Sequence, residues 1–255
     1  MNERGKKITR RALLGLAAAA AAAPFIISAL PRKFGGTRQF RGEWFDVLEV
    51  NLSRHRVELL WRDENGQPLR SMEKAIRYLE RRGEKPVALT NAGIFNLDFT
   101  PAGLHLSDGV VLAPLNEGSG DGNFFLKPNG VFLIDDEGAA IVETSEFRSR
   151  SHVKLATQSG PLLVRHGHLH PAFQPGSGNK KLRSGVGVAA SDRIYFALSS
   201  GMVNFETFAE LFRSELRCPD ALFLDGDISR LWAPSMGLEA LDTGPFTGML
   251  AVVDR

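Results

Sequence analysis

Short apolar runs separated by turn residues follow one another along most of this chain. Residues 43–51 (EWFDVLEVN) and 56–61 (RVELLW) are rich in aromatic and branched side chains, which predicts two strands of a hairpin joined by LSRH. Similar runs predict further strands at 86–90, 110–112, 130–134, 154–156, 161–164, 185–189, 194–198 and 221–224.

Only two segments show the apolar spacing of an amphipathic helix. Residues 71–82 place Met72, Ala75, Ile76 and Leu79 on one face, with Ser71 as a candidate N-cap. Residues 205–216 form a stripe of Phe205, Phe208, Leu211, Phe212 and Leu216. Many strands and two helices predict a single α+β domain built on a mixed, largely antiparallel sheet.

The first thirty residues have a different pattern. Basic residues lead to the pair Arg10-Arg11, and an uncharged, alanine-rich run follows from Ala12 to Leu30. This arrangement is typical of a twin-arginine export signal, although the run is also about long enough for a retained membrane anchor. We therefore expect a periplasmic or otherwise exported protein that meets the twin-arginine export machinery and touches a membrane only through an uncleaved N-terminus. Residues 31–42 are interpreted as a linker, and 43–255 as the folded domain.

Composition narrows the class of partner. The chain has 255 residues, 43% apolar and 24% charged, with a net charge of +2. These values are ordinary for a soluble globular protein, and so small a net charge gives no reason to expect nucleic acid as a partner.

Four stretches place polar side chains beside apolar strands and a glycine. They are TNAGIF (90–95), ATQSGPLL (156–163), NKKLRSGVGV (179–188) and FLDGDIS (223–229). Each alone is compatible with a simple turn, because Asp, Asn and Gly favour turns. Asp225 directly follows the apolar run 221–224, so it is either a turn residue or a carboxylate held at the edge of a cleft. Four such stretches in one domain favour a shared pocket.

Three cations and three histidines are candidates for ligand binding. Lys180, Lys181 and Arg183 are candidate anion binders, and Arg183 is favoured because a guanidinium can grip phosphate with two hydrogen bonds. His166, His168 and His170 alternate around Gly167, which favours a hairpin turn over a metal site. No metal-binding motif is present, so we predict no metal site and no cofactor; a divalent cation has no motif to support it.

The order of these stretches resembles the phosphodiester glycosidase family, the domain of the enzyme that uncovers mannose 6-phosphate, in its exported bacterial branch. The resemblance spans Glu43 to Val253 and includes NAGIF with PAGL (101–104), NFFLKPNGVF (123–132), QSGPLL, LRSGVGV and the segment 204–229. It implies that a pocket is formed by Asn91, Gln158, Ser159, Arg183, Asp225 and Ser229.

Two positions depart from the family pattern. Asp227 stands where relatives often have glycine, and Thr207 stands where they tend to have an acidic residue. Glu206 is one residue away, which is about 100° around a helix. The alternative to an enzyme is therefore a catalytically inactive periplasmic binding protein for sugar phosphates or envelope glycans.

The resemblance implies an exported hydrolase that cleaves the anomeric carbon–oxygen bond of a sugar phosphodiester. Phosphate is a stable leaving group, so the second carboxylate of ordinary glycosidases is less necessary. We assign Asp225 to activating water or stabilising the cationic sugar, and Arg183 to holding the phosphate. Asn91 and Gln158 are expected to orient the substrate, and Asp227 or Glu206 to supply a second carboxylate.

Overall fold

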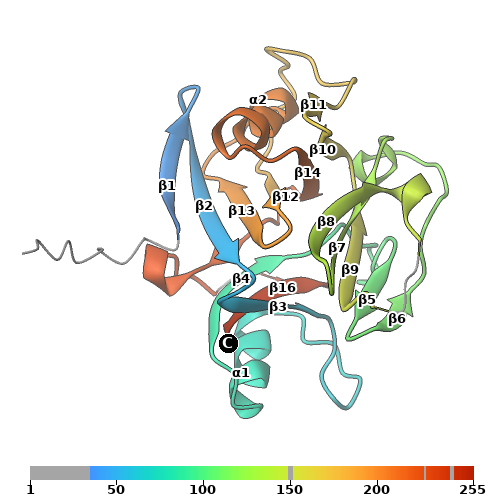
Figure 1. Cartoon of the computed structure of the whole chain (residues 1–255), viewed down its shortest axis with the longest axis vertical. Helices are drawn as coiled ribbons and strands as arrows, with labels where there is room; N and C mark the ends of the chain where they lie inside the picture. The colour runs from blue at the N-terminus through green and yellow to red at the C-terminus, as the bar shows by residue number, and fades with distance from the viewer. Residues whose placement is uncertain (1–34, 149–151, 227, 242–243) are drawn as a thin grey trace, which may run out of the picture. The chain divides into compact units, whose positions relative to one another are not determined.

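The computed structural model describes residues 35–148, 152–226, 228–241 and 244–255. The predicted export signal, residues 31–34 and Asp227 lie outside the described residues. Every pair of strands in the described part of the chain is antiparallel, and the strands form three sheets (Figure 1).

The largest sheet has seven strands in the order β1-β2-β13-β12-β14-β10-β11. Their bounds are β1 Gly35–Phe40, β2 Glu43–Asn51, β13 Arg193–Ser199, β12 Ser184–Ala190, β14 Asp220–Asp225, β10 Leu162–Arg165 and β11 His168–Leu169. In this sheet β14 is an interior strand, and its residues 221–224 are fully buried. The rigid centre of the sheet therefore fixes where Asp225 emerges.

Two smaller sheets complete the fold. One has the order β15-β4-β16-β3, with β15 Leu231–Trp232, β4 Pro86–Asn91, β16 Met249–Asp254 and β3 His55–Leu60. The other has the order β6-β5-β9-β7-β8, with β6 Val110–Ala113, β5 His105–Ser107, β9 Leu155–Ser159, β7 Gly130–Asp135 and β8 Gly138–Glu143. One hydrophobic cluster contains side chains from all three sheets, such as Val186, Leu250 and Phe132, so the sheets share a central core.

The two predicted helices cover outer faces of these sheets. Helix α1, Met72–Arg81, begins at Ser71, whose side chain accepts a hydrogen bond from the Lys74 amide, and its apolar face packs on the four-stranded sheet. Helix α2, Phe205–Glu210, packs on the seven-stranded sheet and continues as a π-helical turn, Leu211–Glu215. The prediction of a single α+β domain with two main helices is confirmed.

The predicted hairpin of residues 43–61 is wrong. The strands β2 and β3 follow one another closely, but they belong to different sheets. Both edges of β2 are already taken, one by β1 and the other by β13, so β3 pairs with β16 instead.

The linker interpretation also needs correction over its described part. Residues 35–40 form strand β1, which pairs with β2 through six residue pairs, and Arg41 and Gly42 make the turn with φ of 50° and 82°. Because β1 lies at the edge of its sheet, its polar residues Thr37, Arg38 and Gln39 stay exposed, and that hid the strand. Strands β5, β8, β11, β15 and β16 were also missed.

No helix among the described residues is long and apolar enough to cross a membrane.

Candidate active site

The three sheets meet where several of their strands end. Strand β4 ends at Asn91, β9 ends at Ser159 and β14 ends at Asp225, while β12 begins at Ser184. A cavity of about 560 Å³ opens there, and we call it the Asp225 cleft. It is lined by Ile94, Phe95, Asn96, Leu97, Ala102, Asp121, Gly122, Asn123, Phe124, Phe125, Lys181, Arg183, Phe223, Asp225, Gly226 and Ile228.

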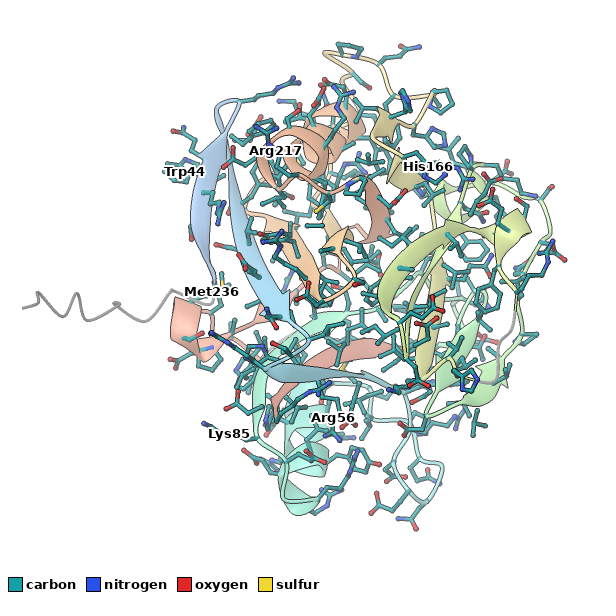
Figure 2. The ribbon with its side chains drawn as sticks, in the orientation of Figure 1. Trp44, Arg56, Lys85, His166, Arg217 and Met236 are labelled. Carbon is teal, nitrogen blue, oxygen red and sulfur yellow. The ribbon has the colours of Figure 1, made fainter. Side chains whose placement is uncertain are left out.

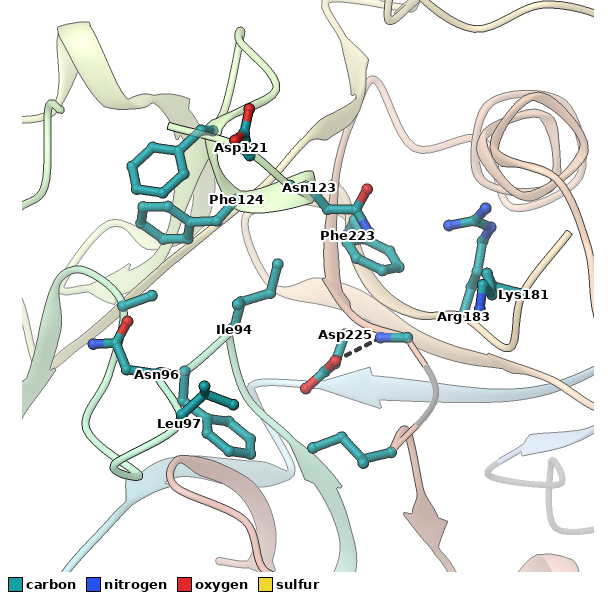
Figure 3. A pocket seen from close by; sticks show the side chains of 16 residues that line it. Ile94, Asn96, Leu97, Asp121, Asn123, Phe124, Lys181, Arg183, Phe223 and Asp225 are labelled. Carbon is teal, nitrogen blue, oxygen red and sulfur yellow. Dashed lines mark hydrogen bonds between the residues drawn. The ribbon is translucent and has the colours of Figure 1, made fainter. Parts of the chain in front are cut away.

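Asp225 stands at the end of a buried strand and lines this cleft. One of its carboxylate oxygens accepts a hydrogen bond from the Gly226 amide at 2.6 Å, and the Ser229 amide donates to the Gly226 carbonyl at 2.8 Å. The turn after β14 is thus the means by which the carboxylate is presented to the cleft. Figure 3 shows Asp225 between Ile94 and Leu97 on one side and Lys181 and Arg183 on the other.

Arg183 is held firmly although it lines the cleft. Only 1% of the residue is exposed, its Nε donates to the Val203 carbonyl at 2.8 Å, and its Nη2 donates to the Asn179 carbonyl at 3.0 Å. Its guanidinium carbon lies 3.5 Å from the ring centroid of Phe205, which is cation–π geometry. With the exposed Lys181 nearby, this wall of the cleft offers fixed positive charge to an anion.

A column of rings supports Arg183 from behind. His170 stacks on Phe173 with centroids 4.8 Å apart, and Phe173 stacks on Phe205 at 4.9 Å with an interplanar angle of 2°. Phe205 thus contacts the guanidinium and the ring of Phe173, and the segment around Phe173 is packed in the same stack of rings. This stacking fixes the guanidinium plane.

The opposite wall of the cleft carries most of its apolar side chains and is held by hydrogen bonds within one loop. In the loop after β4, the Asn96 amide donates to the Thr100 carbonyl at 2.8 Å, and Asp98 Oδ1 accepts from both the amide and the hydroxyl of Thr100. At the tip of this loop Leu97 is 100% exposed, which is unusual for leucine in a loop with so many internal hydrogen bonds. The cleft therefore has its cations on one side and its apolar side chains, with Asn96 and Asp121 among them, on the other.

Four of the predicted substrate-binding residues lie behind the cleft wall instead of lining it. Asn91 donates from Nδ2 to Ser184 Oγ at 3.1 Å and accepts from the Arg230 amide at 3.1 Å, while Ser229 Oγ donates to Ser184 Oγ at 2.9 Å. Asn91 and Ser229 are buried, and these bonds tie β4 to β12.

Gln158 and Ser159 tie the five-stranded sheet to the same region. Gln158 Oε1 accepts from the amides of Leu104 and Asn116, and its Nε2 donates to Asn116 O and Thr144 Oγ1. Ser159 Oγ donates to the Leu224 carbonyl at 3.1 Å and accepts from the Ile94 amide at 3.3 Å. All four hydrogen-bonding positions of the Gln158 amide are used, and neither Asn91 nor Gln158 lines the Asp225 cleft, so a direct role in orienting the substrate does not fit their positions. They position the walls of the cleft.

Glu206 does not line the Asp225 cleft. Its Oε1 accepts from Arg41 Nη1 at 2.7 Å, and the side chain borders a separate, smaller cavity. A role as the second catalytic carboxylate does not fit this position. Thr207 lines neither cavity, and its amide donates to Oδ1 of the N-cap Asn204 at 2.8 Å.

The alternating histidines form a turn, as predicted. His166 and Gly167 have φ of 48° and 79° at the tip between β10 and β11 (Figure 2), and 73% of the His166 side chain is exposed. His168 is exposed, whereas His170 is buried, where desolvation lowers its pKa. Among the described residues no group of three or more His, Cys, Asp or Glu side chains is placed to hold a metal ion.

Several residues of the cleft were not singled out as ligands from the sequence. Asn96, Asp121 and Asn123 all line it; Asp121 lies within the glycine-rich segment 118–122, and Asn123 directly follows that segment. That segment leads into a single 3₁₀ turn, Asn123–Phe125, which brings Asn123 into the cleft. The motif NFFLKPNGVF was the signal that could have indicated Asn123.

Comparison with known proteins gives consistent matches. The family model described as phosphodiester glycosidase matches residues 84–238. The uncharacterized protein YigE of Escherichia coli strain K12 is 32% identical over 203 residues, which cover 80% of this chain and 79% of YigE.

Two solved structures share the fold. One is the zebrafish N-acetylglucosamine-1-phosphodiester alpha-N-acetylglucosaminidase catalytic domain, auto-inhibited by its pro-peptide, with a TM-score of 0.60 and 14% identity over 87% of this chain and 82% of that one. The other is a putative exported protein from Burkholderia pseudomallei K96243, with a TM-score of 0.53 and 12% identity over 82% of this chain and 74% of that one.

Proposed function

The chain belongs to the phosphodiester glycosidase family, and we propose that it is a hydrolase that cleaves the bond between the anomeric carbon of a sugar and a phosphodiester oxygen. The observation that carries the proposal is the Asp225 cleft, in which the carboxylate at the end of β14 faces a cavity whose wall also holds Lys181 and Arg183. The cleft thus combines a base with an anion-binding wall.

Each residue has a role in the proposed reaction. Asp225 accepts a proton from water, and the water oxygen forms a bond to the anomeric carbon. The carbon–oxygen bond to phosphate breaks, and both of its electrons remain on the phosphate oxygen. Lys181 and Arg183 stabilise that charge. A phosphomonoester with a second pKa of about 6 is a stable anion, so no general acid is required on the leaving group.

The substrate class follows from the same arrangement. The zebrafish relative is named for an N-acetylglucosamine 1-phosphodiester. We assign this chain to sugar 1-phosphodiesters as a class. Ile94, Leu97 and Phe124 form the apolar side of the cleft, a suitable surface for the carbon–hydrogen face of a sugar ring.

We also propose that the protein acts outside the cytoplasm, because of the pair Arg10-Arg11 and the uncharged run that follows it. Changing both arginines to lysine keeps the charge and is expected to block export. Wild-type levels of the double variant in the periplasm would contradict this proposal.

A p-nitrophenyl diester of a sugar 1-phosphate tests the reaction. Carbon–oxygen cleavage releases free sugar and colourless p-nitrophenyl phosphate, whereas phosphorus–oxygen cleavage releases yellow p-nitrophenolate and a sugar 1-phosphate. We expect reducing sugar to appear without direct colour. Across a panel of sugars, direct colour would contradict the proposal, and binding of the diesters without turnover would favour the inactive binding protein.

A further inference from the structure

A second cavity adjoins the Asp225 cleft. It has a volume of about 180 Å³, and its polar lining includes Asn123, Gln174, Ser177, Asn179 and Glu206. We call it the Glu206 pocket. Asn123 lines both cavities, so the two meet at this residue.

The position of Arg183 relates the pocket to the substrate. Its Nη2 donates to the carbonyl of Asn179, and its guanidinium lies on the ring of Phe205; both of these residues line the Glu206 pocket. On the proposed function, the sugar lies beside Asp225 and the phosphate lies on the Arg183 wall. The second ester arm of the phosphate then leaves the cleft on the Arg183 side, where the Glu206 pocket adjoins it.

The chemistry of the pocket suits hydroxyl groups. Glu206 is bound to Arg41 through Oε1, and its Oε2 has no partner among the residues that the structure describes. Only 12% of the Glu206 side chain is exposed, so it is fixed in place. Arg41 balances its charge, which lowers the repulsion toward a neighbouring phosphate. A carboxylate oxygen accepts hydroxyl hydrogens, and the amide of Gln174 both donates and accepts.

Size limits the group that fits. A water molecule takes up about 30 Å³ of the liquid, so the cavity has room for about six waters. Bonded atoms lie closer together than separate waters, so a polyol as small as glycerol fits within this volume. We infer that the Glu206 pocket binds the leaving half of the diester, and that this half is a small polyol. The inference rests on the proposed function, which places the sugar beside Asp225, the phosphate on the Arg183 wall and the polyol in the Glu206 pocket.

The ion pair has a purely structural alternative. Arg41 lies in the turn between β1 and β2, so its bond to Glu206 also fastens this hairpin to α2. Loss of that fastening would change stability and the binding of all phosphates alike. A polyol subsite would change only the binding of the polyol ester.

Calorimetric titration with glycerol 3-phosphate and with methyl phosphate separates the two roles. We expect the wild-type protein to bind glycerol 3-phosphate about tenfold more tightly, the scale of one hydrogen bond to a charged group. Glu206→Gln should remove this preference and leave the affinity for methyl phosphate within about twofold of wild type. Gln174→Ala should reduce the preference, and it spares the ion pair if Glu206→Gln proves unstable.

Glu215→Gln is the matched control. Glu215 lies on the turn after α2, pairs with Arg38 at 3.6 Å and lines neither cavity, so its variant should keep the wild-type preference. Equal wild-type affinities for the two phosphates would overturn the inference, as would an equal loss for both in Glu206→Gln. Hydrolysis of glycerol and methyl diesters of one sugar is measured in parallel, and failure of both reactions would count against the proposed function alone.

Discussion

Two sets of polar residues occupy the same meeting point of three sheets, on opposite sides of the cleft wall. One set (Asn91, Gln158, Ser159 and Ser229) is at most 2% exposed and bonded within the protein. The other set (Asn123, Lys181 and Asp225) lines the Asp225 cleft, whereas Arg183 lines the cleft but is itself buried and hydrogen-bonded within the protein. Both sets belong to the same family-like motifs. A motif residue can therefore serve by fixing a strand end as well as by touching a substrate.

The difference between the sets has an energetic basis. A buried amide with all its hydrogen bonds made is costly to disturb, because its partners are left unsatisfied in a low-dielectric interior. A carboxylate at the cleft contributes to chemistry and little to packing. Substitutions in the buried set should lower stability, and substitutions in the cleft set should lower turnover at nearly constant stability.

Asp225→Asn should give the largest effect. It keeps the size of the side chain and removes the base, so turnover should fall by about 10²–10⁴-fold, the range for a general base. The melting temperature should change little. Steady-state kinetics measure the turnover, and thermal unfolding measures the melting temperature. Asp220→Asn, at the other end of β14, is the control and should keep its rate. A wild-type rate in Asp225→Asn would remove this residue from the mechanism.

Gln158→Leu should lower the stability of the protein, because Gln158 belongs to the buried set. The substitution leaves the amides of Leu104 and Asn116 without their acceptor, at a cost of about 3 kcal/mol in the free energy of unfolding. Denaturant unfolding measures this loss, and Gln39→Leu on the exposed edge strand β1 is the control, expected to change little. If Gln158→Leu instead has wild-type stability and binds substrate poorly, Gln158 contacts the substrate and does not belong to the buried set.

Acid should lower the stability of the protein through the buried His105. His105 is the neighbour of Leu104, and burial lowers its pKa from 6.5 to about 4. The unfolded chain takes up a proton near pH 6.5 and the folded protein only near pH 4, so stability falls as pH drops through this window. The loss approaches about 3 kcal/mol at its lower end.

The loss is measured by urea unfolding at several pH values. His105→Phe should flatten the dependence, since it keeps a ring beside Trp61 and removes the titration. The exposed His168→Ala is the control and should retain the wild-type slope. An unchanged slope in His105→Phe would show that other groups cause the acid sensitivity.

Local pattern was sufficient for much of the fold. The apolar stripe and Ser71 cap of α1 were visible in the sequence, and so were the buried runs of β14 and β12, because these elements are set by neighbouring residues. Sheet pairing was not visible. Strand β2 pairs with β13, more than a hundred residues later, and nothing local in residues 43–61 rules out a hairpin.

The candidate site, like the fold, was only partly predictable from the sequence. Asp225 stood out because a carboxylate directly follows a buried run, and the family resemblance then favoured a cleft residue over a turn residue. The direction of the Gln158 side chain could not be predicted. A polar residue at a strand end can face a cavity or a buried loop, and the local sequence is the same in both cases. Asn123 lies in a loop whose approach to β14 depends on the contact of two sheets, and it was missed for that reason.

The most direct test of the central claim is to follow oxygen during hydrolysis of a sugar 1-phosphodiester in water enriched in oxygen-18. If Asp225 directs water to carbon, the label enters the anomeric hydroxyl of the released sugar, and the phosphomonoester remains unlabelled. Mass spectrometry of both products gives the answer. Label in the phosphate would show attack at phosphorus and contradict the assignment of this chain as a glycosidase.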